Sequence, residues 1–197
     1  AEGALDGWLA GDAAGYRALC LALIEEFGRT TNADVAELVA RTCLLVPDSL
    51  SGLDPAFALA DLTATSNTNS PRFRTVKGMA EYRRGDFLGA LRWLAEPRDA
   101  LTLEAGALAG CYFAMAKQRL QETEAAQAAL AQVDKRLPPG IVGLLSSRDL
   151  VPYLISRTEA ERVVHRRDMS PPFDAAAIAA ARAEAQDPPP PTAASPS

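Results

Sequence analysis

The sequence predicts an all-α protein, a right-handed solenoid of antiparallel helix pairs followed by a disordered C-terminal tail rich in proline and alanine. Apolar residues recur at spacings of three and four, as at Ala126, Leu130 and Val133, and no stretch alternates as a strand does. Breaking and capping residues divide the chain into runs of helical length joined by short connections. Aromatic residues make up only 6% of the 197 residues, whereas hydrophobic residues make up 48%.

The first two expected helices are bounded by polar caps and breakers. Asp12 precedes a run over 13–27, and Gly28 follows it as a C-terminal cap. Thr31 or Asn32 caps the next run, which extends from Ala33 to Val46 and stops at a proline.

The remaining helices are placed by the same signals. Asp54 and Ser70 each precede a proline, the combination expected of an N-cap and a first helical turn. Gly85 with Asp86 is a tight turn, and Ser147 or Asp149 caps the last helix. We therefore expect helices over 55–65, 71–84, 87–95, 103–120, 123–136 and from 147 or 149 to about 166.

The composition changes near residue 168, so we expect a helical-repeat domain over 1–167 and a tail over 168–197. The tail is rich in alanine and proline, and a short helix is expected over 175–186. The segment after 187 has four consecutive prolines and no large apolar residue. Its burial cannot offset the loss of chain entropy, which predicts disorder.

An internal repeat supports the solenoid. A shift of 36 residues aligns Gly78 with Ala114, Ala80 with Ala116, Ala90 with Ala126, Leu94 with Leu130, and Pro97 with Val133. Small residues at such positions let paired helices approach closely, and one pair cannot bury its apolar face alone, so pairs stack. The clearest repeats are expected over 71–97 and 104–138.

Two stretches, VKGMAEYRRGDFLGALRWL over 76–94 and AMAKQRLQETEAAQAAL over 114–130, resemble tetratricopeptide-like regions, in which each repeat is a helix, a tight turn and a second helix. The segment GDAAGYRALCLALIEEFGRTTNADVAELVARTCLLVPDS over 11–49 is similar to the C-terminal helical regions of large bacterial serine/threonine kinases. The kinase phosphate loop and catalytic motifs do not occur in the sequence. The second resemblance therefore implies a non-catalytic part of such an enzyme.

The tetratricopeptide resemblance implies a binding site on the concave face formed by the first helix of each pair. The corresponding residues are Arg72, Thr75, Met79, Tyr82, Arg83, Leu108, Cys111, Met115, Gln118 and Arg119. Arginine, methionine and tyrosine suit an adaptable peptide groove, so we expect a protein or peptide partner, with the arginines orienting an acidic one. The Lys and Asn set that clamps a C-terminal carboxylate in some relatives does not occur at these positions.

We therefore expect a non-catalytic protein–protein interaction module that binds a peptide or partner protein in a concave helical groove. One alternative is a regulatory or substrate-positioning C-terminal region of a bacterial serine/threonine kinase. Another is a stand-alone helical enzyme. The only support for it is His165, which could act as a general base with Asp168 as its orienting partner. A histidine near a helix C-terminus is more simply a surface residue favoured by the helix dipole, so no catalytic residue is expected.

Charge and cysteine spacing exclude several other classes. The net charge is 20 − 25 = −5, and the basic group Arg72, Arg74, Lys77, Arg83 and Arg84 has no aromatic interleaving of the kind that stacks bases, so nucleic acid is not an expected partner. The apolar runs fall well short of the roughly twenty residues of a membrane span, so no membrane insertion is expected. The single histidine and the scattered Cys20, Cys43 and Cys111 predict no metal site, no cofactor, and buried thiols in a cytoplasmic setting.

Overall fold

The computed structural model describes residues 12–47, 52–99, 103–137 and 147–165, and within these residues it contains eight α-helices and no strand. The all-α prediction is confirmed. The helices are α2 (Ala13–Phe27), α3 (Ala33–Leu45), α4 (Asp54–Ser66), α5 (Pro71–Arg84), α6 (Phe87–Leu94), α7 (Leu103–Arg119), α8 (Thr123–Arg136) and α10 (Ser147–His165). A short 3₁₀ turn, η1 (Pro97–Asp99), follows α6. Among the helices described, none combines the length and apolar character that crossing a membrane requires.

Local capping explains where several helices begin and end. The Asn32 side chain accepts hydrogen bonds from the backbone N–H groups of Asp34 and Val35 at the start of α3. Gly85 ends α5 with a φ of 85°, a left-handed conformation that glycine adopts without strain. The expected cap at Asp54 is wrong: the N-cap position is Leu53, and Asp54 lies in the first turn, where the helix dipole favours its charge.

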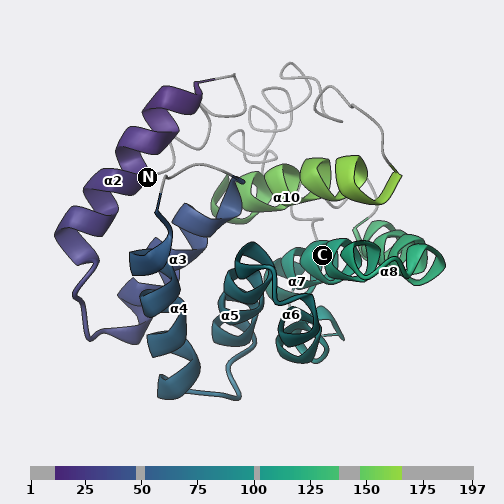
Figure 1. The fold of residues 1–197 in the computed structure, drawn as a ribbon, viewed down its shortest axis with the longest axis horizontal. Helices are drawn as coiled ribbons and strands as arrows, with labels where there is room; N and C mark the ends of the chain where they lie inside the picture. Colours follow the sequence, from purple (N-terminus) through teal and green to yellow (C-terminus); the bar gives the residue numbers. More distant parts are fainter. Residues whose placement is uncertain (1–11, 48–51, 100–102, 138–146, 166–197) are drawn as a thin grey trace, which may run out of the picture.

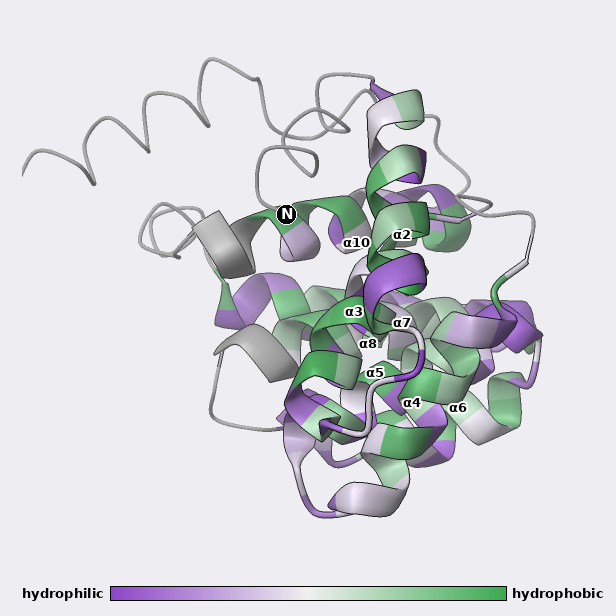
Figure 2. Ribbon diagram, turned by 90° about the vertical axis from the view of Figure 1, so that its left-hand side faces the viewer, coloured by the Kyte–Doolittle hydropathy of each residue, from purple (hydrophilic) through white to green (hydrophobic). Residues whose placement is uncertain are grey.

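The helices form layers. Neighbours in the sequence pack together, α3 on α4, α5 on α6, and α7 on α8. The helices α3, α5 and α7 also pack against one another in a row, whereas α4 and α6 lie on the outer side of this row and α8 lies beside α7 (Figure 1). The last helix, α10, packs mainly on α7 and also contacts α8 and α3. Figure 2 shows α10 above α3 and α7 in a second view, so both views place it on the side opposite α4 and α6.

Close approach between paired helices depends on small residues. A Cβ atom added to Gly78 would lie 2.4 Å from Cγ of Leu94, so α6 packs against α5 where a glycine leaves room. The aligned residues Ala90 and Ala126 are both fully buried, and Leu94 and Leu130 are at most 1% exposed. These aligned positions are therefore buried in both stretches.

Some expectations concern residues outside the described ranges. They include the tail over 168–197, the short helix over 175–186, the segment before Asp12 and the residue Asp168. The expected helices over 13–27, 71–84 and 123–136 have the bounds found in the structure, and the others differ by a residue or two.

Candidate functional site

The residues expected on the concave face lie on one side of α5 and α7, which we call the inner face. Most of them are buried: Thr75, Met79, Tyr82, Leu108, Cys111 and Met115. Of the expected arginines, Arg83 keeps only 7% of its side chain exposed, whereas Arg72 and Arg119 are exposed. Gln118 is half-buried. Part of the same chain therefore covers most of this face.

The helix α10 covers the α7 side of the inner face and reaches α5 through Arg83. It packs along α7, and Cys111 of α7 lies within electrostatic range of both Tyr153 and Arg157 of α10. Leu108 and Met115 stand three residues before and four after Cys111, so all three share one side of α7. Every residue of α10 from Val151 to Ser156 is buried. The covering helix is thus itself part of the core.

Arg83 joins α10 to the rest of the molecule. Its guanidinium donates to both carboxylate oxygens of Glu159, at 2.5 and 2.7 Å. It also donates to the carbonyl oxygens of Leu44 and Leu45 at the end of α3, each at 2.8 Å, and to the Tyr112 hydroxyl at 2.9 Å. Burial lowers the pKa of Arg83, but Tyr112 and Glu159 outweigh it, and the pKa lies above its ordinary value. One buried cation therefore connects α3, α5, α7 and α10.

A second ion pair holds α10 on its other side. The Arg157 guanidinium donates to both carboxylate oxygens of Asp134 on α8, at 2.8 and 2.9 Å, and pairs with Glu161 one turn further along α10. Burial lowers the pKa of Arg157, yet its hydrogen bonds to these two carboxylates raise it above the ordinary value. Both ion pairs are bidentate, the geometry that fixes an arginine most firmly.

The two other arginines expected on this face differ from each other. Arg72 pairs with Asp34 at 2.5 Å and lies 3.7 Å from Glu37, so it connects α5 to α3. Arg119 donates a long hydrogen bond of 3.5 Å to the Tyr82 hydroxyl, which raises the pKa of Arg119. Because Arg119 is also exposed, it is a cation at the edge of the inner face with room for a further partner.

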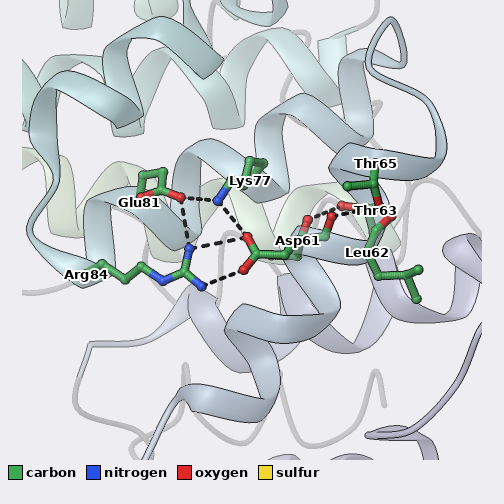
Figure 3. A network of polar contacts seen from close by, with 8 residues as sticks. Asp61, Leu62, Thr63, Thr65, Lys77, Glu81 and Arg84 are labelled. Carbon is green, nitrogen blue, oxygen red and sulfur yellow. Dashed lines mark hydrogen bonds and ion pairs between the residues drawn. The ribbon is translucent and has the colours of Figure 1, made fainter.

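The rest of the basic group on α5 is neutralised within the chain. Lys77 and Arg84 both donate to Asp61 of α4, at 2.6 and 2.8 Å, and both pair with Glu81 (Figure 3). Partial burial opposes ionisation of Asp61, but the hydrogen bonds from Arg84 and Lys77 hold its pKa below the usual range. This network connects α4 and α5, so the basic stretch of sequence is an internal connection.

The three cysteines and the histidine, which are the residues that could carry chemistry, lie in ordinary structural environments. Cys20, Cys43 and Cys111 are thiols buried within the fold, and burial raises the pKa of Cys111 to about 12. His165 lies 3.8 Å from Glu161 near the end of α10. Among the described residues, no group of three His, Cys, Asp or Glu side chains could hold a metal ion.

The most important partners on the inner face were missed by sequence reasoning. Glu159 and Asp134 make the two bidentate pairs, and the Tyr112 hydroxyl accepts a hydrogen bond from Arg83. Glu159 stands 76 residues from Arg83, and no local pattern connects positions so far apart. The usable signal was the helical pattern over 147–166, which identified the helix without its location.

Comparison with protein family models, curated proteins and solved structures finds no match to this chain. The function is therefore argued from the residues and contacts of the inner face. Its chemistry consists of buried apolar side chains, a buried arginine that binds a carboxylate, and an exposed arginine at the edge.

Proposed function

We propose that this chain is a non-catalytic protein–protein interaction module, a tetratricopeptide-like solenoid that binds a helical segment on the inner face of α5 and α7. One observation carries the proposal: this face already receives a helix, α10, through apolar packing and a bidentate ion pair from Arg83 to Glu159. A surface that fits one helix has the shape and polarity to bind another of the same chemistry.

The composition of the inner face supports binding. Met79 and Met115 are flexible side chains, which suit a surface that adapts to its occupant, and Tyr82 packs edge-on against Tyr112. Arg83 is a charged group that lies on the same face as these side chains. Anchors of arginine and tyrosine within an apolar surround are the usual centre of a protein interface.

The ionisation of the buried groups favours binding over catalysis. Burial raises the pKa of Cys111 to about 12, and it also raises the pKa of Tyr82 and of Tyr112. These groups therefore stay protonated and neutral near pH 7. A catalytic nucleophile requires a lowered pKa or a neighbouring base, and the inner face supplies the opposite environment.

The test is selection of helical peptides by display against the full chain, followed by hydrogen exchange with each selected peptide. We expect bound peptides to slow exchange in α5 and α7. Exposed Arg119 at the edge of the face is the site for a charge reversal, because its change leaves the core intact. Arg119→Glu should weaken the selected peptides several-fold, and Arg92→Glu on the outer helix α6 is the matched control.

Equal binding to the wild type, to Arg119→Glu and to Arg92→Glu would exclude the inner face as the binding surface. Protection confined to α4 or α6 would do the same, since these helices lie on the opposite side of the row.

A further inference from the structure

The two ion pairs of α10 lie on opposite sides of that helix. Glu159 binds Arg83 of α5, and Arg157 binds Asp134 of α8. Each residue of an α-helix turns by about 100°, so side chains two residues apart differ by about 200°. Between the two pairs lies α7, on which α10 rests. The inner face therefore has a positive edge at α5 and a negative edge at α8.

These edges determine the direction in which a helix can lie on the face. A helix lying in the reverse direction exchanges its two sides. Its arginine would then face Arg83, and its glutamate would face Asp134. Both contacts would be repulsive, which disfavours the reversed complex. The face thus selects a helix that carries an arginine and, two residues later, a glutamate.

Small residues let α10 approach α7. Ser156 and Ala160, one turn apart on the same side of α10, are both fully buried. They lie on the side of Tyr153, which is close to Cys111 of α7. A long side chain at either position would hold the helix away and stretch both ion pairs. The fitting sequence is therefore small–Arg–any–Glu–small, as in residues 156–160.

The other helices also pack on one another. α3 contacts α4, α5 contacts α6 and α7 contacts α8, and α3, α5 and α7 contact one another along the row. In a stack of helix pairs, the loss of a terminal helix leaves the remaining neighbours paired. Its departure would leave Arg83 without a carboxylate and uncover the apolar inner face, so another occupant is needed.

We infer that α10 is a resident occupant and that the external partner is an amphipathic helix with the small–Arg–any–Glu–small sequence, which replaces α10 and presents its glutamate to Arg83. This inference rests on the proposed function and names the class of partner. Because α10 is tethered, its effective concentration is in the millimolar range, and it competes with the partner until its own contacts are weakened.

The experiment uses full-length chains and a fluorescent peptide with the sequence of residues 147–165 as the probe, measured by anisotropy. Glu159→Gln weakens the resident helix, so the probe should bind this chain about tenfold or more tightly than the wild type. Glu161→Gln is the matched control, because Glu161 pairs with Arg157 and His165 of its own helix. The probe should bind the control chain as it binds the wild type.

Two further probes test the chemistry. A probe with Glu159→Gln, and one in which Arg157 and Glu159 are exchanged, should each lose the gained affinity. Asp134→Asn is a second chain variant that preserves folding, since the Asp134 side chain is 49% exposed. A probe with Arg157→Gln should bind this variant more tightly than it binds the wild type. The resident α10 loses the pair between its Arg157 and Asp134, whereas the probe has no arginine at that position and loses nothing.

Equal binding of all probes to all chains would overturn the inference, as would the absence of binding to both variants. Neither result would remove the proposed function if selected helices of another sequence still bound the inner face in an Arg119-dependent manner. Failure of both experiments together would remove the proposed function as well.

Discussion

The side chain of Arg83 shows what residue spacing can and cannot predict. Helical spacing places Arg83 on the same side of its helix as Met79, and the repeat resemblance assigns that side to ligand binding. The burial of the guanidinium could not be inferred, because its partners Leu44, Tyr112 and Glu159 lie 39, 29 and 76 residues away. Contacts over such separations depend on the packed structure.

Gly78 provides a test at the scale of one residue. Alanine in a helix interior is more favourable than glycine by about 1 kcal/mol. Here the added Cβ would lie 2.4 Å from Cγ of Leu94, a fully buried side chain. Overpacking of about 1–3 kcal/mol should exceed the gain, so Gly78→Ala should lower the free energy of unfolding in urea.

Gly52→Ala is the control for that substitution, because nothing lies within 4 Å of its added Cβ. Its free energy of unfolding should stay within about 0.5 kcal/mol of the wild type. A Gly78→Ala chain more stable than the wild type would contradict the close approach of α5 and α6.

At the scale of the element, most helix ends were predictable because their signals are local. Asn32 and Gly85 act on backbone groups within a few residues, so the sequence around each is sufficient to locate the end. Asp54 was misassigned because an acidic residue before a proline suits both the N-cap and the first turn. Only the backbone conformation distinguishes the two.

The pairing of α5 with α6 and of α7 with α8 can be tested with leucine truncations. Leu94 and Leu130 are at most 1% exposed, so Leu94→Ala and Leu130→Ala should each lower the free energy of unfolding by about 2–5 kcal/mol. Leu88 also lies on α6 but is 62% exposed. Leu88→Ala should therefore change the free energy of unfolding by less than about 0.5 kcal/mol. Denaturant unfolding of the three variants measures this, and equal effects of Leu88→Ala and Leu94→Ala would refute the assigned faces.

At the scale of the whole molecule, the sequence predicted α10 as a helix but not its place. In a surface helix, an apolar stripe in the sequence identifies the side that is buried. In α10 all residues from Val151 to Ser156 are buried, so its first half carries no such stripe. The repeat pattern gave no guidance either, because α10 lies outside the stretches over 71–97 and 104–138 in which the sequence predicts repeats.

The connection between α10 and the stack can be measured with a double-mutant cycle on Arg83 and Glu159, both changed to methionine. Glu159→Met leaves a buried cation without its carboxylate and should lower the free energy of unfolding by about 3–5 kcal/mol. Arg83→Met should cost at least as much, because it also removes the donor to the carbonyl groups of Leu44 and Leu45.

Once Arg83 is methionine, the carboxylate of Glu159 has no cation to neutralise it, and its removal relieves a buried charge. Glu159→Met should therefore have little or no further effect in the Arg83→Met chain, and the double variant should be far more stable than the sum of the single losses predicts. Urea unfolding of the four chains measures the coupling. Additive losses would mean that the pair does not hold α10, and that apolar packing on α7 alone places this helix.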